Sequence, residues 1–137
     1  MQVSDDGQAA VERMVRLFYE RALANEVLGP IFRESIKDWE THIAIVRQFW
    51  SSVLHGTDRY KGNPFGAHLK LRFEPEAFAH WLTVFESAAQ DALGCKDVEK
   101  AKRIARHMAD SFKLGLFPFT GPDGRPSRTP RGTTNRP

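Results

Sequence analysis

The sequence predicts a single all-α domain. Three observations lead to this fold class: apolar residues recur at steps of three and four along several segments, no segment alternates apolar and polar residues as a β-strand does, and a chain of 137 residues suits one globular unit with its own core. We expect the domain to span residues 1–119, and a flexible basic tail rich in Pro and Gly to span residues 120–137.

The first two helices are expected at residues 8–25 and 39–54. The apolar stripe of the first helix consists of Val11, Met14, Val15, Phe18 and Ala22, with Tyr19 at its border. Gly29-Pro30 then interrupts the periodicity among large apolar groups, which predicts a buried corner at residues 28–32. Asp38 is the expected N-cap of the second helix, whose inward stripe consists of Trp39, His42, Ile43, Val46, Phe49, Trp50 and Val53.

Two further helices are expected after an irregular connection at residues 56–67. The third opens at Glu74-Pro75-Glu76, because Pro suits the first turn and carboxylates suit the positive end of the helix dipole, and it ends at Gly94. Its apolar face consists of Phe78, Trp81, Leu82, Phe85, Ala88 and Ala89. The fourth helix follows Asp97, closes near Phe117 and carries Ala101, Ile104, Ala105, Met108 and Phe112 on its apolar face.

Charge and cysteine content exclude several classes of partner. The net charge of +3 lies in the tail, where four arginines stand against one aspartate, so residues 1–119 are neutral and offer no basic face to nucleic acid. The single Cys95 has no second cysteine for a disulfide or a thiolate metal site, which favours a reducing, cytoplasmic setting. No apolar run approaches the ~18 residues of a membrane span, so we expect no membrane association.

Four side chains with polar tips fall on inward positions of this pattern: Tyr19, His42, His68 and Trp81. Each by itself is a common core residue with a satisfied hydrogen bond. Together they point to a ligand, because each unpaired buried polar group costs about 1–3 kcal/mol and a polar ligand in an apolar pocket would serve several of them at once. The other histidines, His55, His80 and His107, are expected at the surface.

Other chemistries lack their motifs in this sequence. Nucleophilic hydrolysis is disfavoured because there is no Gly-x-Ser-x-Gly elbow and no base placed beside Cys95. Phosphate-binding and dinucleotide-binding glycine patterns are absent as well. The histidines lack the i, i+4 spacing of a helical zinc site, so no zinc is expected.

Seven short motifs together resemble the truncated haemoglobins, and most closely their group III. The motifs are Phe18-Tyr19, Leu28-Gly29-Pro30-Ile31-Phe32, Trp39 with His42 three residues later, Phe49-Trp50, Tyr60-x-Gly62-x-Pro64, His68-Leu69, and Phe78 followed by Trp81-Leu82 and Phe85. The resemblance covers residues 8–117, and the absence of Gly-Gly pairs agrees with group III. It implies a truncated globin fold, which is a two-over-two helical sandwich around a haem pocket.

The resemblance also implies one non-covalent haem b per chain, with His68 as the proximal iron ligand and Tyr19, His42 and Trp81 on the distal, ligand-binding side. The residue chemistry agrees in kind, because a histidine beside a turn has carbonyls to hold its second nitrogen, and Tyr and Trp offer donors to a partly negative ligand. The candidate cofactor-binding residues are Phe32, His42, Val46, Phe49, Trp50, His68, Arg72, Trp81, Phe85 and Met108. Arg72 and its neighbour Lys70 are the candidates for the haem propionates.

Three functions fit this pattern. The first is reversible binding and transport of a diatomic gas such as oxygen. The second is redox turnover, either peroxidase-like or nitric-oxide-detoxifying as a dioxygenase, with a reductase as partner. The third is electron transfer by a haem ligated by both His42 and His68, since His42 can bond the ligand, swing outward as a gate or bind the iron. The expected state is a monomer or weak dimer.

Overall fold

The computed structural model describes residues 5–56, 74–117, 119–120 and 126–127. Over these residues the chain is helical except for one short pair of strands. The elements are α1 (Asp5–Ala24), α2 (Leu28–Ser35), α3 (Trp39–His55), α5 (Ala77–Ala92), α6 (Cys95–Leu116), β1 (Phe119–Thr120) and β2 (Pro126–Ser127). The prediction of an all-α domain is confirmed.

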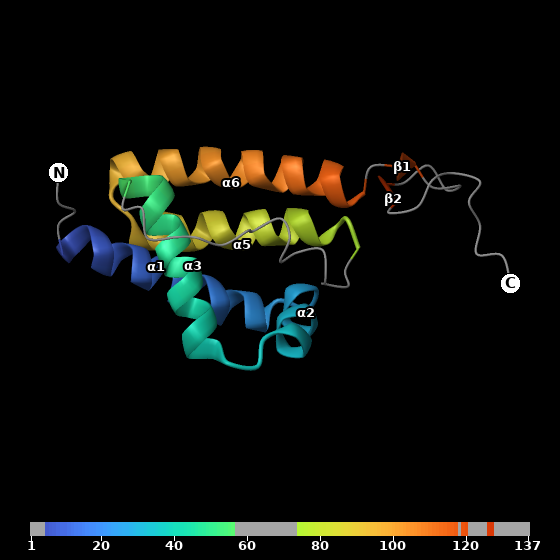
Figure 1. The fold of residues 1–137 in the computed structure, drawn as a ribbon, viewed down its shortest axis with the longest axis horizontal. Helices are drawn as coiled ribbons and strands as arrows, with labels where there is room; N and C mark the ends of the chain where they lie inside the picture. Colours follow the sequence, from blue (N-terminus) through green and yellow to red (C-terminus); the bar gives the residue numbers. More distant parts are fainter. Residues whose placement is uncertain (1–4, 57–73, 118, 121–125, 128–137) are drawn as a thin grey trace, which may run out of the picture.

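The helices form two layers of two. Figure 1 shows α6 running back along α5 as one layer, while α1 and α3 cross each other as the second. The layers meet where α1 packs along α5 and where α3 contacts α6. The short α2 lies at one end of the sandwich and packs against α1 and α5. This arrangement is the two-over-two sandwich that the resemblance implied.

The core lies between the layers and is built on the stripe predicted for α1. Val11, Met14 and Ala22 have no exposed surface, and they pack with the small buried residues Ala88 and Ala89 of α5. Alanines on the facing helix let the two backbones approach closely, while the large apolar groups of α1 fill the remaining space. The helix begins at Asp5, three residues before the expected start, and ends at Ala24.

The corner predicted at residues 28–32 is wrong in one respect, because this segment is the helix α2. Asn25 starts it, since its side-chain oxygen accepts hydrogen bonds from the backbone N–H groups of Val27 and Leu28 at 2.8 and 2.9 Å. Pro30 lies in the first turn, where a missing N–H breaks no helical bond. The Gly-Pro pair therefore marks the beginning of a helix, although Leu28 and Gly29 are buried as predicted.

The boundaries of α3 follow the sequence signals closely. The side chain of Asp38 caps the helix by accepting from the backbone N–H of Thr41 at 3.2 Å. Gly56 ends it in the left-handed conformation with φ 67°, which glycine adopts without steric cost. The expected connection at residues 56–67 lies outside the described residues beyond Gly56, and so does His68.

The start of α6 and the chain after it differ from the prediction. The helix begins at Cys95 with Gly94 as its N-cap, so Asp97 lies within the first turn rather than before the helix. Beyond α6, Phe119–Thr120 pairs antiparallel with Pro126–Ser127, and no strand signal in the sequence predicts this pair. Most of the predicted flexible tail lies outside the described residues, and the expectation of a mobile tail stays a prediction.

Two of the three histidines expected at the surface are partly or largely covered. His55 has only 14% of its side chain exposed, and its Nε2 lies 2.9 Å from a carboxylate oxygen of Asp97 across the α3–α6 contact. His80 is half-buried, with its Nδ1 3.4 Å from the side-chain amide of Asn25. His107 is exposed, as predicted. No helix among the described residues is long and apolar enough to cross a membrane.

Candidate functional site

A cavity of about 410 Å³ lies between the two layers, and each of the five described helices contributes to its wall. Its volume falls within the range of typical small-molecule sites. Nine of the predicted site residues lie on this wall: Tyr19, Phe32, His42, Val46, Phe49, Trp50, Trp81, Phe85 and Met108. The structure therefore brings together residues that are spread over 90 positions of the sequence.

Three predicted residues cannot be placed on this wall. His68, Arg72 and Lys70 lie outside the described residues, so their roles stay predictions. The prediction also missed some wall residues of α2 and its C-cap, namely Ile31, Ser35 and the C-cap residue Ile36. They were missed because the segment was predicted as a corner, and a helix beginning at Leu28 would have placed Ile31 and Ser35 on one face. Phe78 and Phe112 were predicted only as apolar faces of their helices, and they line the cavity as well.

The most polar feature of the wall is a contact between Tyr19 of α1 and His42 of α3. The hydroxyl oxygen of Tyr19 lies 2.6 Å from Nε2 of His42, which is a short hydrogen bond, and the two rings meet edge to face. Either atom can donate, depending on which imidazole nitrogen carries the proton. The contact depends on the crossing of α1 and α3, because the two residues are 23 positions apart.

Burial controls the charge state of Tyr19. Tyr19 is 7% exposed, and desolvation raises the pKa of its phenol well above the ordinary value, because a phenolate would lose its hydration there. The side chain is therefore a neutral phenol at any physiological pH. His42 is half-buried. The cavity wall thus holds a neutral hydroxyl and an imidazole that share a hydrogen bond.

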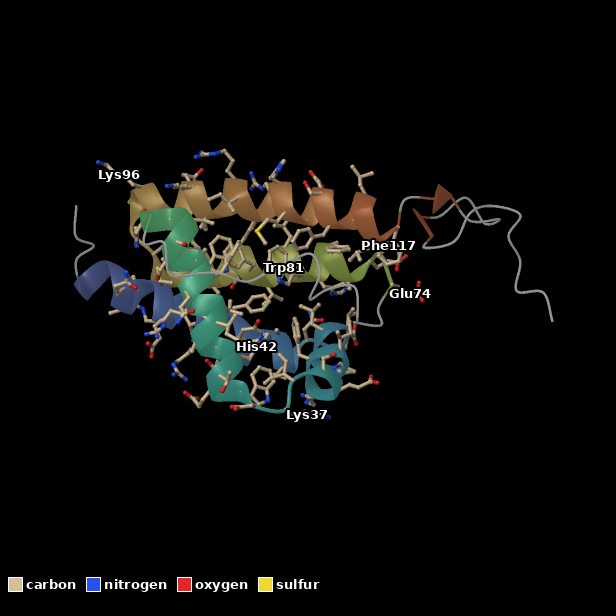
Figure 2. The ribbon with its side chains drawn as sticks, in the orientation of Figure 1. Lys37, His42, Glu74, Trp81, Lys96 and Phe117 are labelled. Carbon is tan, nitrogen blue, oxygen red and sulfur yellow. The ribbon has the colours of Figure 1, made fainter. Side chains whose placement is uncertain are left out.

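The cavity wall also carries a stack of flat rings. Trp81 and Phe85 of α5 are stacked with ring centroids 5.4 Å apart and an interplanar angle of 11°. Phe85 in turn stacks on Trp50 of α3 at 4.6 Å and 20°. Figure 2 shows Trp81 and His42 in the interior, on α5 and α3 respectively. Trp81 makes no hydrogen bond among the described residues, so its indole N–H is available to a ligand.

Comparisons with known proteins agree with this geometry. The sequence profile of the bacterial-like globin family matches residues 6–114. The chain belongs to the bacterial-like globin family. It is 32% identical over 123 residues to the group 3 truncated hemoglobin ctb of Campylobacter jejuni, a match that covers 83% of this chain and 94% of that protein.

A solved structure confirms the truncated globin fold. The crystal structure of the group III truncated hemoglobin from Campylobacter jejuni superposes with a TM-score of 0.76 and 30% sequence identity, covering 85% of this chain and 96% of that chain. The chain is therefore a truncated haemoglobin of group III, and the resemblance read from the seven motifs is confirmed. As a globin, it belongs to a family that binds haem.

The wall residues of this truncated haemoglobin fit a haem group. A flat apolar macrocycle needs flat apolar walls, and the stacked rings of Trp81, Phe85 and Trp50 provide one. An axial gas ligand needs hydrogen-bond donors, which Tyr19, His42 and Trp81 carry. No group of three or more His, Cys, Asp or Glu side chains among the described residues could hold a bare metal ion.

Proposed function

We propose that this truncated haemoglobin holds one haem b non-covalently in the cavity and binds a diatomic gas such as oxygen reversibly. The observation that carries the proposal is the composition of the wall, which is apolar and aromatic except for Ser35 and the donors Tyr19, His42 and Trp81. Bound haem would supply a ferrous iron able to take up the gas. The remaining requirements fall to the protein.

Retention of the haem would depend on two kinds of contact. The apolar contacts come from Phe32, Val46, Phe49, Trp50, Phe85 and Met108, all on the cavity wall. His68 would be the proximal iron ligand, an assignment that rests on the resemblance to the truncated haemoglobins. Arg72 and Lys70 would pair with the haem propionates. A proximal imidazole must be neutral and oriented by its second nitrogen, so His68 would need a backbone carbonyl or a similar acceptor nearby.

The distal donors would control ligand release. Donors that face a partly negative ligand hold it by charge-assisted hydrogen bonds, which are stronger than neutral ones. When Nε2 of His42 carries a proton and donates to Tyr19, the tyrosine hydroxyl keeps its own proton for the ligand. When Nε2 is unprotonated, the hydroxyl donates to His42 instead, and Trp81 is left as the donor. The tautomer of His42 therefore decides which residue holds the gas.

The short Tyr19–His42 bond bears on the two competing functions. It favours redox turnover as the second candidate, because a phenol bonded to an imidazole can deliver a proton to an oxidant in the cavity. It disfavours ligation of the iron by both His42 and His68, since Nε2 of His42 would have to break this bond before binding metal. A cytoplasmic setting, a reductase partner and a monomeric or weakly dimeric state stay predictions.

Optical spectroscopy tests the proposal. We expect the purified chain to take up one equivalent of haem on titration, to be five-coordinate in the ferrous state without gas, and to change its spectrum reversibly with oxygen. A ferrous spectrum that is six-coordinate without gas would support iron ligation by both histidines. Rapid consumption of peroxide with little oxygen release would favour redox turnover, and a chain that takes up no haem would contradict all three functions.

A further inference from the structure

We propose that Tyr19, His42 and Trp39 form an exit path for oxidising equivalents from the cavity. In this path Tyr19 loses an electron while its hydroxyl proton moves to Nε2 of His42, and Trp39 then replaces the electron from the protein surface. The inference rests on the proposed function in one respect, since hydrogen peroxide reacting with bound haem would be the source of the oxidising equivalent. The path itself is built from described residues only.

The first step requires a base at the phenol. Removing an electron from a neutral phenol creates a strongly acidic cation, so the oxidation is accessible only when a nearby group takes the proton at the same time. Tyr19 is 7% exposed and cannot release its proton to water. Its hydroxyl has one hydrogen-bond partner among the described residues, which is Nε2 of His42 at 2.6 Å. An unprotonated imidazole nitrogen at this distance is a suitable acceptor.

The second step requires an oxidisable neighbour closer to solvent. Trp39 meets this need, because its ring centroid lies 5.4 Å from that of Tyr19 at an interplanar angle of 71°, and its side chain is half-buried. It also contacts His42, with centroids 6.2 Å apart. Trp39 is not part of the cavity wall, whereas Tyr19 and His42 are. The three residues thus lead outward from the cavity.

The other two tryptophans do not offer this exit. Trp50 is 4% exposed and stacks on Phe85, so an oxidising equivalent on Trp50 would remain in the core. Trp81 contacts Phe18 and Phe85, has no hydrogen-bonded base among the described residues and makes no ring contact with Tyr19. Among the three tryptophans of the chain, only Trp39 combines contact with Tyr19 and a position toward the surface.

Electrons and protons balance along the path. Hydrogen peroxide takes two electrons and two protons and gives two molecules of water. Each electron comes from Tyr19, which becomes a neutral phenoxyl radical while His42 becomes an imidazolium. Trp39 returns the electron, the proton returns from His42 to Tyr19, and Trp39 releases its indole proton to water. A thiol or ascorbate in solution then reduces the indolyl radical.

The test uses a Tyr60→Phe background, so that Tyr19 is the single tyrosine of the chain. The haem-loaded protein, with loading checked by absorption, is mixed with hydrogen peroxide and frozen rapidly for electron paramagnetic resonance. We expect a tyrosyl radical that is lost in Tyr19→Phe and reduced in yield in His42→Leu. Trp39→Phe should prolong its decay, whereas His107→Ala, on the exposed side of α6 and outside the cavity wall, should leave the decay unchanged.

A second arm needs no haem, so it separates this inference from the proposed function. Photogenerated ruthenium tris-bipyridine oxidises accessible side chains from solution, and Trp39 is reachable whereas Tyr19 is not. We expect a tyrosyl radical in the Tyr60→Phe chain and its loss in the added Trp39→Phe variant. If the chain takes up no haem but forms a tyrosyl radical that depends on Trp39, the Tyr19–Trp39 path is supported although the proposed function is not. Two results would overturn the path: equal photochemical radical yields with and without Trp39, or a decay of the peroxide-generated radical that Trp39→Phe does not change.

Discussion

The hydroxyl of Tyr19 and Nε2 of His42 lie 2.6 Å apart on the wall of the cavity, at the crossing of α1 and α3. Both residues belong to the same hydrogen-bonded unit, so neither acts on a ligand independently of the other. The same wall holds the stacked rings of Trp81, Phe85 and Trp50. This division of the wall into a polar and an aromatic part is the basis of the first two predictions.

Tyr19→Phe should accelerate oxygen release while the haem is retained. Phenylalanine keeps the ring contacts and removes only the hydroxyl, so the loss is one charge-assisted hydrogen bond of about 1.5–3 kcal/mol. Because 1.4 kcal/mol is a factor of ten, we expect the dissociation rate to rise about ten- to hundredfold in stopped-flow measurements. Trp39→Phe is the control, since Trp39 does not line the cavity. An unchanged rate in Tyr19→Phe would remove Tyr19 from the ligand side.

His68→Ala and Trp81→Phe should affect the haem differently. His68→Ala removes the iron ligand, so we expect the haem to transfer to apomyoglobin when this protein is added in excess as a haem acceptor. Trp81→Phe keeps an aromatic ring on the stack and removes only the N–H donor. We expect Trp81→Phe to hold haem and to change the rate of ligand release. His107→Ala, on the exposed side of α6, is the matched control for removing a histidine. Equal loss of haem in both site variants would contradict the assigned roles.

Gly29→Ala should destabilise the fold. A Cβ at this position would lie 2.7 Å from the backbone carbonyl oxygen of Leu23, where α1 ends against α2, and a backbone atom has little freedom to move away. Overpacking of this kind costs about 1–3 kcal/mol, measurable by urea unfolding of the haem-free chain. Gly115→Ala is the control, because this glycine lies on the exposed side of α6, where alanine suits the helix. Similar stabilities for the two variants would show that α2 can shift outward.

Asp38 should make the stability depend on acid pH. Hydrogen bonds from the hydroxyl and backbone N–H of Thr41 lower the pKa of its carboxyl below the ordinary value. Because the pKa of this carboxyl is lower in the folded state, it stabilises the fold at pH values above its pKa in the unfolded chain. This contribution disappears as the pH falls through its pKa in the folded state. We expect Asp38→Ala to lower the melting temperature at neutral pH, with a difference from the parent that shrinks below pH ~4.

Asp97→Ala should weaken the contact between α3 and α6. Its carboxylate accepts from His55, which is largely buried and whose Nδ1 already lacks a hydrogen-bond partner among the described residues. Leaving Nε2 unpaired as well should cost about 1–3 kcal/mol in urea unfolding. Asp97→Asn keeps an acceptor and should recover most of the loss, whereas Asp110→Ala on the exposed face should be neutral. A loss in Asp97→Asn equal to that in Asp97→Ala would assign the effect to charge rather than to this bond.

Local chemistry alone predicted much of the fold. Asp38 and Gly56 mark the two ends of α3 because capping is a property of a few neighbouring residues, and the stripe of α1 is visible because helical periodicity repeats within it. The same reasoning failed where a signal has two readings. Gly29-Pro30 interrupts the helical periodicity of the sequence, but the pair lies in the first turn of α2. Gly94 rather than Asp97 caps α6, and the sequence did not reveal this because a glycine N-cap offers no side-chain oxygen to recognise.

The sequence by itself determined four of the five described helices, their apolar faces and nine of the residues that line the cavity. Only the tertiary structure decided which of these residues touch each other. The Tyr19–His42 bond, the His55–Asp97 pair and the stack of Trp81, Phe85 and Trp50 each join different helices. Such contacts depend on crossing angles and on the rotation of each helix about its axis. Both are set by the packing of the whole core, and no local pattern encodes them.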